Sequence, residues 1–295
     1  MTKFFLPLLF FITLLSCDSK EEPTLLSDSA ETYVPVPGSG TFNFLHDRKE
    51  RVYHYYQPLN LPEKAPLVFM LHGYNGDAEE FMNWLSMEKL ADENGFAFVF
   101  PQGYEDVWGT THWNANLDIS NVDDIGFLSE LAIHLQETYN LDPERTFTSG
   151  FSNGGFMSYE LIIKKPDVFR AAASIAGTMS GETWTNRNLA EPKPVLQLSG
   201  GRDRIVPING AMSTNGGWGG APEMTEIIDF WVGLNEANSQ NHSQIGETKI
   251  YKYSNGDNNS EVWYYLIENM EHNFPLGNQY NVHTPSLIWE FFSKY

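Results

Sequence analysis

The sequence predicts an α/β fold, with a mostly parallel central sheet and helices on both faces. From about residue 41, short apolar runs typical of buried strands alternate with longer segments of helical period. The composition is that of a globular protein, with 41% hydrophobic and 19% charged residues in 295. No internal repeat or low-complexity tract marks a second domain boundary. We therefore expect a single domain over residues 41–295.

The expected elements follow one another in a regular order. Strands are predicted at 66–71, 96–100, 145–148, 171–175, 195–198 and 262–267, and helices at 78–94, 124–139, 153–165, 223–234 and 284–292. Gly95 ends the first helix, and Pro166 ends the third. Right-handed crossovers between parallel strands place the helices on both faces. Active sites in such folds form at the carboxyl ends of the strands.

The first 40 residues are expected to lie outside this domain. Lys3 is followed by an apolar run at 4–15, which is too short to span a bilayer comfortably. Leu14-Leu15-Ser16-Cys17 resembles the lipobox of bacterial lipoproteins, and the acidic residues after it resemble a surface-export signal. These features predict a lipid anchor and an outer-membrane or cell-surface location. The expected segments are a signal peptide at 1–16 and a flexible tether at 17–40 that begins with lipidated Cys17.

The charge balance excludes several partners. Eighteen Lys and Arg residues against 38 Asp and Glu residues give a formal charge of −20. This charge repels phosphate backbones and anionic lipids, so nucleic-acid binding is disfavoured and membrane contact is expected only through the lipid anchor. One cysteine excludes an intramolecular disulfide framework and a multi-cysteine metal site. We expect the protein to be a monomer.

A candidate nucleophile lies in Gly150-Phe151-Ser152-Asn153-Gly154, which fits the pattern G-x-S-x-G. The pattern alone is weak evidence, but this one lies between the strand predicted at 145–148 and the following helix. A serine on such a strand-to-helix turn points out over the sheet, and flanking glycines leave room for it. The Asn153 backbone N–H would then face a developing oxyanion. We predict that Ser152 is the nucleophile.

A serine nucleophile needs a histidine base. His242, His272 and His283 follow Ser152 with room for an acid between them. His272 is the predicted base, because it comes directly after the strand predicted at 262–267. His242 lies in a polar stretch typical of a solvated surface, and His283 precedes the last helix.

The histidine in turn needs a carboxylate that holds its tautomer. Asp203 is the predicted acid, because it follows the strand at 195–198 on a turn loosened by glycines. The alternative for Asp203 is a surface ion pair with Arg202 or Arg204. Glu268 is then the fallback acid.

The loop Leu71-His72-Gly73-Tyr74-Asn75-Gly76 follows the first predicted strand. Its glycines let backbone N–H groups approach a substrate oxygen, and the Tyr74 N–H is predicted as the second oxyanion donor beside that of Asn153. His72 precedes the serine in the sequence. We predict that His72 is a structural histidine that bonds loop carbonyls.

Several ordered motifs together resemble the polyhydroxybutyrate-depolymerase and feruloyl-esterase family, which includes carbohydrate esterase family 1. The resemblance spans about residues 50–293. It implies an α/β-hydrolase fold, a triad of Ser152, Asp203 and His272, and no metal or organic cofactor. The motifs are Leu71-His72-Gly73, Trp113-Asn114, Val122-Asp123-Asp124-Ile125-Gly126-Phe127, Gly150-Phe151-Ser152-Asn153-Gly154-Gly155, Pro166-Asp167-Val168-Phe169, Asp203 with Val206-Pro207, and His272 with Phe274-Pro275.

The substrate is less well defined by the sequence. Trp108, Trp113, Trp184 and Trp218 fall in predicted loops, where exposed rings stack on sugars or aromatic acids; packing over the sheet explains any one of them equally well. Trp113 and Trp218 are our candidate substrate-binding residues. The resemblance implies a serine carboxylic-ester hydrolase, namely a feruloyl or acetyl-xylan esterase acting on an ester-bearing plant glycan. A polyester depolymerase is the alternative, and a non-catalytic surface binding protein is a further one.

Overall fold

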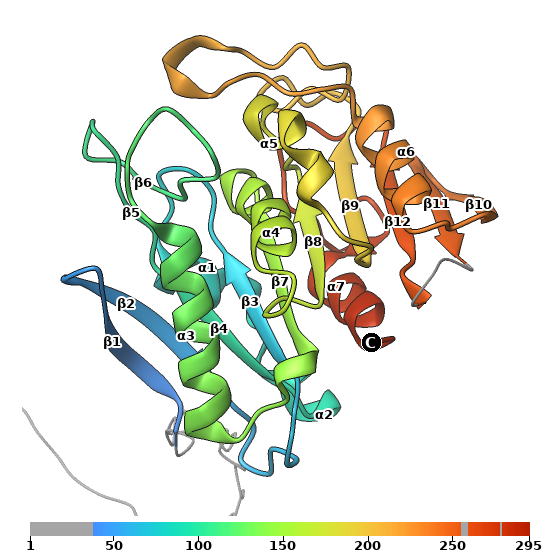
Figure 1. Cartoon of the computed structure of the whole chain (residues 1–295). Helices are drawn as coiled ribbons and strands as arrows, with labels where there is room; N and C mark the ends of the chain where they lie inside the picture. The colour runs from blue at the N-terminus through green and yellow to red at the C-terminus, as the bar shows by residue number, and fades with distance from the viewer. Residues whose placement is uncertain (1–37, 255–258, 278) are drawn as a thin grey trace, which may run out of the picture. The chain divides into compact units, whose positions relative to one another are not determined.

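A computed structural model describes residues 38–254, 259–277 and 279–295 (Figure 1). These residues belong to one compact unit, Pro35–Tyr295. The predicted signal peptide, Cys17 and most of the predicted tether lie outside the described residues. Within the described ranges, no helix is both long enough and apolar enough to cross a bilayer.

Ten strands of the described residues form one sheet, in the order β1-β2-β4-β3-β7-β8-β9-β12-β11-β10. All pairs from β4 to β12 are parallel, and the pairs at both edges are antiparallel. The parallel strands are β4 (Ala97–Pro101), β3 (Leu67–Leu71), β7 (Thr146–Phe151), β8 (Ala171–Ile175), β9 (Val195–Gly200) and β12 (Val262–Ile267). The edge strands are β1 (Gly40–His46), β2 (Lys49–Tyr56), β11 (Thr248–Ser254) and β10 (Ser239–Ile245).

Two small hairpins lie apart from this sheet. The first pairs β5 (Tyr104–Glu105) with β6 (Thr111–His112), and the second pairs β13 (Leu276–Gly277) with β14 (Val282–His283). Both hairpins follow the carboxyl end of a parallel strand, β4 in the first case and β12 in the second.

Helices cover both faces of the sheet, as predicted. Along β3, Leu67, Phe69 and Leu71 pack into one core with α3, α4 and α6, whereas Val68 and Met70 pack into the other core with α1, α2 and α7. In Figure 1, α3 and α4 lie over the strands. The helices are α1 (Ala78–Leu85), α2 (Glu88–Asn94), α3 (Asp124–Tyr139), α4 (Asn153–Lys164), α5 (Gly181–Thr185), α6 (Met224–Leu234) and α7 (Thr284–Phe292).

The structure corrects two expectations about secondary structure. The single helix predicted at 78–94 is divided into α1 and α2, because Ser86 adopts a left-handed conformation with φ 46° and ends α1. Edge strands were not predicted at all, and β10 shows why. All seven of its residues are exposed, so it carries no apolar pattern that marks a strand.

Candidate active site

Ser152 occupies a tight turn between β7 and α4. It is the residue before the helix, with φ 53° and ψ −118°, and its backbone N–H donates to the Ile175 carbonyl of β8 at 2.8 Å. A residue with a side chain in this region of φ and ψ is strained by about 1–3 kcal/mol, and such strain is common at active sites. The turn therefore has the geometry predicted for a nucleophile elbow.

Two glycines make the close approach of α4 possible. A Cβ atom on Gly150 would lie 2.2 Å from the carbonyl carbon of Gly154. A Cβ atom on Gly154 would lie 2.2 Å from the carbonyl oxygen of Leu71 on β3. Both distances are far below van der Waals contact, so this turn accepts only glycine at these positions.

Asp203 and His272 meet above the neighbouring strands β9 and β12. Asp203 Oδ2 lies 2.7 Å from His272 Nδ1, and Asp203 Oδ1 accepts hydrogen bonds from the Ile205 and Val206 N–H groups at 2.8 Å each. The buried carboxylate is thus held by its own loop. Because Nδ1 faces Asp203, Nε2 of His272 is the nitrogen left to act as a base.

The structure does not favour the alternatives considered for the acid and the base. Asp203 uses its two oxygens for His272 and its own loop rather than for Arg202 or Arg204. Glu268 pairs with Lys249 at 2.6 Å. His283 caps α7, where its side chain accepts from the Ser286 N–H, and His242 lies on the exposed strand β10.

The loops that carry Ser152 and His272 are in contact. The ring of Phe151, the residue before Ser152, lies 5.0 Å from the His272 ring between centroids. Ser152, Asp203 and His272 follow β7, β9 and β12, whose carboxyl ends share one edge of the sheet. The structure therefore brings the three predicted residues to the same edge, where α/β folds place their active sites.

His72 stabilises the loop at residues 71–76, called the oxyanion loop below because it carries the predicted donor Tyr74. Its Nδ1 lies 2.7 Å from the Gly73 carbonyl oxygen, and its Nε2 accepts a hydrogen bond from the Gly103 N–H at 2.9 Å. Burial lowers the pKa of His72 to about 4, so the ring is neutral at physiological pH. His72 is a structural residue, as predicted.

The predicted oxyanion donors, the backbone N–H groups of Tyr74 and Asn153, remain available. Neither donates a hydrogen bond to an acceptor within the described part of the chain. The hydroxyl of Tyr74, by contrast, has a partner, since it donates to Asp106 Oδ2 at 2.6 Å. Unpaired N–H groups beside a serine elbow can stabilise negative charge that develops on a substrate oxygen.

The prediction that Trp113 binds substrate is wrong, because its side chain is completely buried. Its indole Nε1 donates to the His72 carbonyl at 3.0 Å. Its backbone pairs with the side chain of Asn153, which accepts from the Trp113 N–H at 2.7 Å and donates to the Trp113 carbonyl at 2.9 Å. Trp113 thus connects the two segments that carry the predicted oxyanion donors.

The other predicted substrate contact, Trp218, is half-buried beside the oxyanion loop. Its ring packs edge-to-face on Tyr74, with centroids 5.1 Å apart and an interplanar angle of 75°. The remaining loop tryptophans differ from each other. Trp108 is largely exposed, whereas Trp184 lies under the guanidinium of Arg187 at 4.0 Å. Trp218 remains a candidate for substrate contact.

A buried ion pair supports the Trp113 loop and was missed in the sequence. Arg51 Nη2 donates to Asp124 Oδ1 at 2.6 Å, and Asp124 Oδ2 accepts from the Asn114 N–H at 2.8 Å. Burial raises the pKa of Asp124, and the guanidinium of Arg51 opposes that rise. One sequence signal points to this role. Arg51 is the only charged residue in the stretch 51–56, which otherwise consists of a valine, a histidine and three tyrosines.

The preceding aspartate of the same motif has a different task. Asp123 Oδ1 accepts from the Gly126 N–H at 2.8 Å and caps α3. A Cβ atom on Gly126 would lie 2.2 Å from Asp123 Oδ2, which explains why glycine follows at this spacing. The Asp-Asp-Ile-Gly sequence therefore starts α3 and also supports the Trp113 loop.

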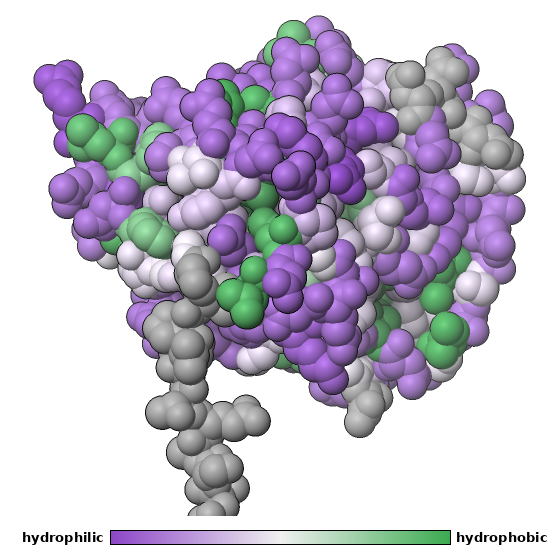
Figure 2. Space-filling model, turned by 90° about the horizontal axis from the view of Figure 1, so that it is seen from below, coloured by the Kyte–Doolittle hydropathy of each residue, from purple (hydrophilic) through white to green (hydrophobic). Residues whose placement is uncertain are grey.

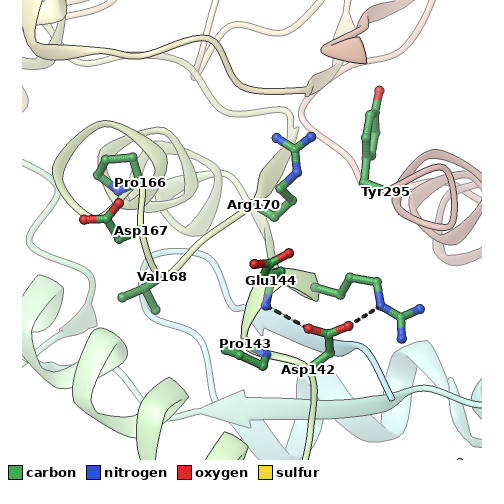
Figure 3. A pocket seen from close by; sticks show the side chains of 9 residues that line it. Asp142, Pro143, Glu144, Pro166, Asp167, Val168, Arg170 and Tyr295 are labelled. Carbon is green, nitrogen blue, oxygen red and sulfur yellow. Dashed lines mark hydrogen bonds and ion pairs between the residues drawn. The ribbon is translucent and has the colours of Figure 1, made fainter. Parts of the chain in front are cut away.

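A pocket of about 450 Å³ lies at the amino ends of the parallel strands, away from Ser152 (Figure 3). It is lined by residues that directly precede β7 and β8, together with Tyr295. Figure 3 shows Asp142 accepting hydrogen bonds from the Glu144 N–H and from Arg145. None of the predicted site residues lines this pocket.

The family model described as esterase PHB depolymerase matches residues 52–222. The chain belongs to this family. The matched region includes Tyr74, Ser152 and Asp203, whereas His272 lies beyond it. Membership of this esterase family confirms the resemblance found in the sequence motifs.

Similar curated proteins are also esterases. The chain is 30% identical over 154 residues to a bifunctional acetylxylan esterase/xylanase from Neocallimastix patriciarum, an alignment that covers 52% of this chain and 21% of that protein. It is 25% identical over 287 residues to "Probable feruloyl esterase C" from Aspergillus niger, covering 91% of this chain and 96% of that protein. The chain spans less than half the length of the first curated relatives that it matches.

Solved structures share the fold of this family member. The acetyl xylan esterase from Aspergillus awamori superposes with a TM-score of 0.64 at 13% sequence identity, covering 87% of this chain and 100% of that one. At this level of identity the match concerns the fold alone. The predicted α/β-hydrolase fold is confirmed.

Proposed function

We propose that the protein is a serine carboxylic-ester hydrolase with Ser152 as nucleophile, His272 as base and Asp203 as acid. The observation that carries this proposal is the 2.7 Å hydrogen bond between Asp203 and His272, at the same sheet edge as the strained Ser152 turn. The free N–H groups of Tyr74 and Asn153 form the oxyanion hole.

The reaction follows from these positions. Ser152 Oγ attacks the ester carbonyl carbon while His272 Nε2 takes the hydroxyl proton, and the carbonyl oxygen becomes an oxyanion. Asp203 stabilises the imidazolium. Collapse of the tetrahedral intermediate breaks the bond to the alcohol, which leaves with the proton from His272. Water then attacks the acyl-enzyme with His272 as base, and the carboxylic acid is released.

We further propose that the substrate is a feruloyl or acetyl ester of a plant polysaccharide. Support comes from the similar proteins that are named acetylxylan esterases or feruloyl esterases. A neutral polysaccharide is also compatible with a formal charge of −20. Polyester hydrolysis is the alternative, because the family description includes depolymerases of that kind.

The test is hydrolysis by purified residues 18–295 beside the Ser152→Ala variant. The substrates are methyl ferulate, acetylated xylan, poly(3-hydroxybutyrate) and p-nitrophenyl butyrate. Ferulate or acetate release that disappears in the variant supports the glycan esterase. Release of hydroxybutyrate alone supports the polyester alternative, and no turnover of any ester contradicts a serine hydrolase.

We also propose that Cys17 anchors the enzyme to a membrane through lipid chains, as the lipobox sequence predicts. In the native host, a Cys17→Ala variant should move from the membrane fraction to the soluble fraction. Retention of that variant in the membrane fraction would contradict the anchor.

A further inference from the structure

A second pocket, of about 290 Å³, opens between α1 and the oxyanion loop. It shares Gly73, Tyr74 and Phe151 with the candidate active site, and its far wall is formed by Phe81 and Trp84 of α1. The sequence motifs did not draw attention to α1. The pocket is therefore adjacent to the candidate active site, and its far wall consists of side chains with no role in the proposed chemistry.

Aromatic rings connect His272 to the far wall of this pocket. The Phe151 ring lies 5.0 Å from the His272 ring and 6.0 Å from that of Phe274. The Phe274 ring in turn lies 5.8 Å from Phe81 and 5.7 Å from Trp84. Phe81 and Phe274 are buried, whereas Trp84 is 49% exposed. The exposed ring is thus held in place by a buried cluster that begins at the histidine.

Carboxylates line the same pocket. Asp77 and Glu80 are both exposed: Asp77 caps the start of α1, and Glu80 lies four residues before Trp84 on the same helical face. An aromatic ring can stack on the apolar face of a sugar, and carboxylates accept hydrogen bonds from sugar hydroxyls. The same carboxylates repel anionic groups.

We propose that this pocket binds the sugar residue that forms the alcohol side of the ester, with Trp84 as the stacking surface and Glu80 as a hydrogen-bond acceptor. This inference rests on the proposed function and adds the location of the sugar. His272 returns its proton to the departing alcohol oxygen, so the alcohol must lie on the His272 side of Ser152. The ring cluster extends from that side to Trp84.

Four substrates separate the alcohol side from the acyl side. They are a feruloylated arabinose, methyl ferulate, an acetylated xylobiose and methyl acetate. Trp84→Ala should lower kcat/KM by about tenfold or more for both sugar esters, mainly through KM, and change the methyl esters by less than about twofold. Trp84→Tyr should restore most of the loss. If Trp84→Ala impairs methyl ferulate but not methyl acetate, the pocket binds the acyl group and the proposal is wrong.

Matched controls distinguish the pocket from general destabilisation. Glu80→Ala should lower kcat/KM for the sugar esters about threefold, and Glu79→Ala, which removes an exposed carboxylate outside the pocket, should have no effect. Trp289→Ala removes a half-buried tryptophan at the opposite sheet edge. Equal losses in Trp84→Ala and Trp289→Ala on all four substrates would overturn the proposal.

A binding measurement keeps this inference separate from the proposed function. The Ser152→Ala variant should bind xylobiose in isothermal titration calorimetry, and the double variant with Trp84→Ala should not. Suppose that the wild type hydrolyses p-nitrophenyl butyrate, but the single and the double variant bind xylobiose equally or neither binds it. The proposed sugar site is then wrong, whereas the triad stands. If the wild type hydrolyses no ester, the proposed function fails whatever the calorimetry shows.

Discussion

Pockets of different character lie at the amino ends of the parallel strands, here called the amino edge, and at their carboxyl ends, the carboxyl edge. The pocket at the amino ends has a volume of about 450 Å³, whereas the carboxyl ends carry a pocket of about 290 Å³ beside Phe151 and one of about 740 Å³ lined by the loops after β6, β8 and β9. In the pocket at the amino ends, Asp142 caps a short helical turn and binds Arg145, and Arg170 lies 5.5 Å from the Tyr295 ring. From below, that edge is mostly hydrophilic with small separate apolar groups (Figure 2).

At the carboxyl edge, by contrast, several polar groups are strained or lack a partner among the described residues. Ser152 is strained, two backbone N–H groups have no acceptor within the described residues, and the Asp203–His272 pair leaves a ring nitrogen available. The difference shows that the presence of a cavity does not by itself locate the candidate active site, because both ends of the strands carry one. Groups held in strained or unpaired states locate it, because only those groups gain from binding a substrate.

The largest expected effect follows from Asp203→Asn at the carboxyl edge. An amide accepts poorly from His272 and favours the wrong imidazole tautomer, so kcat should fall by about 10⁴. Circular dichroism should show an unchanged fold, and Glu268→Gln serves as the control with a loss below about twofold. A loss below about tenfold in Asp203→Asn would remove Asp203 from the triad.

The buried imidazole of His72 predicts how stability depends on pH. Burial lowers its pKa to about 4, against 6.5 in the unfolded chain, so the unfolded chain binds more protons between those values. The free energy of unfolding should therefore fall as the pH is lowered from about 6.5 to 4, by up to about 3 kcal/mol from this group. His72→Gln should show a shallower fall in urea titrations at pH 7 and pH 4.5. Parallel curves for the two proteins would contradict this.

A smaller effect is expected where side chains only position the oxyanion donors. Asn153→Ala keeps the backbone N–H but loses both hydrogen bonds to Trp113, so kcat should fall about tenfold with little change in KM. Tyr159→Phe in the same helix removes a buried hydrogen bond to Gln197 and is the matched control. If both variants lose the same activity, Asn153 contributes only to stability.

The smallest effect is expected at the amino edge. Asp142→Ala removes a helix cap and an ion pair with Arg145, which should cost about 1 kcal/mol of stability. Ester hydrolysis at a temperature well below unfolding should change by less than about twofold. A large loss of activity in this variant would show that the two edges are not functionally separate.

The sequence predicted those parts of the molecule that have local signals. Buried parallel strands are continuous apolar runs, and the elbow is a motif of five consecutive residues. The acid and the base were found because each follows a recognisable strand. Their assignment also required the known chain order of such triads.

The roles that the sequence did not reveal depend on distant contacts. Trp113 donates to a carbonyl 41 residues away, and Arg51 pairs with an aspartate 73 residues away. Neither has a local pattern that separates a buried tryptophan from an exposed one or a paired arginine from a solvated one. Trp84 lies at helical spacing with Phe81 and Leu85, and this periodicity does not show that the Trp84 ring remains half-exposed while the other two are buried.

The order in which the site residues occur along the chain affects when activity can appear. Ser152 and Asp203 are synthesised well before His272, which lies 69 residues after Asp203. A chain whose β12 has not yet joined β9 therefore has the proposed nucleophile and acid but lacks the proposed base at its position. If the proposed triad is correct, hydrolysis requires this long-range pairing of β12 with β9, so ester turnover should report that the pairing has formed.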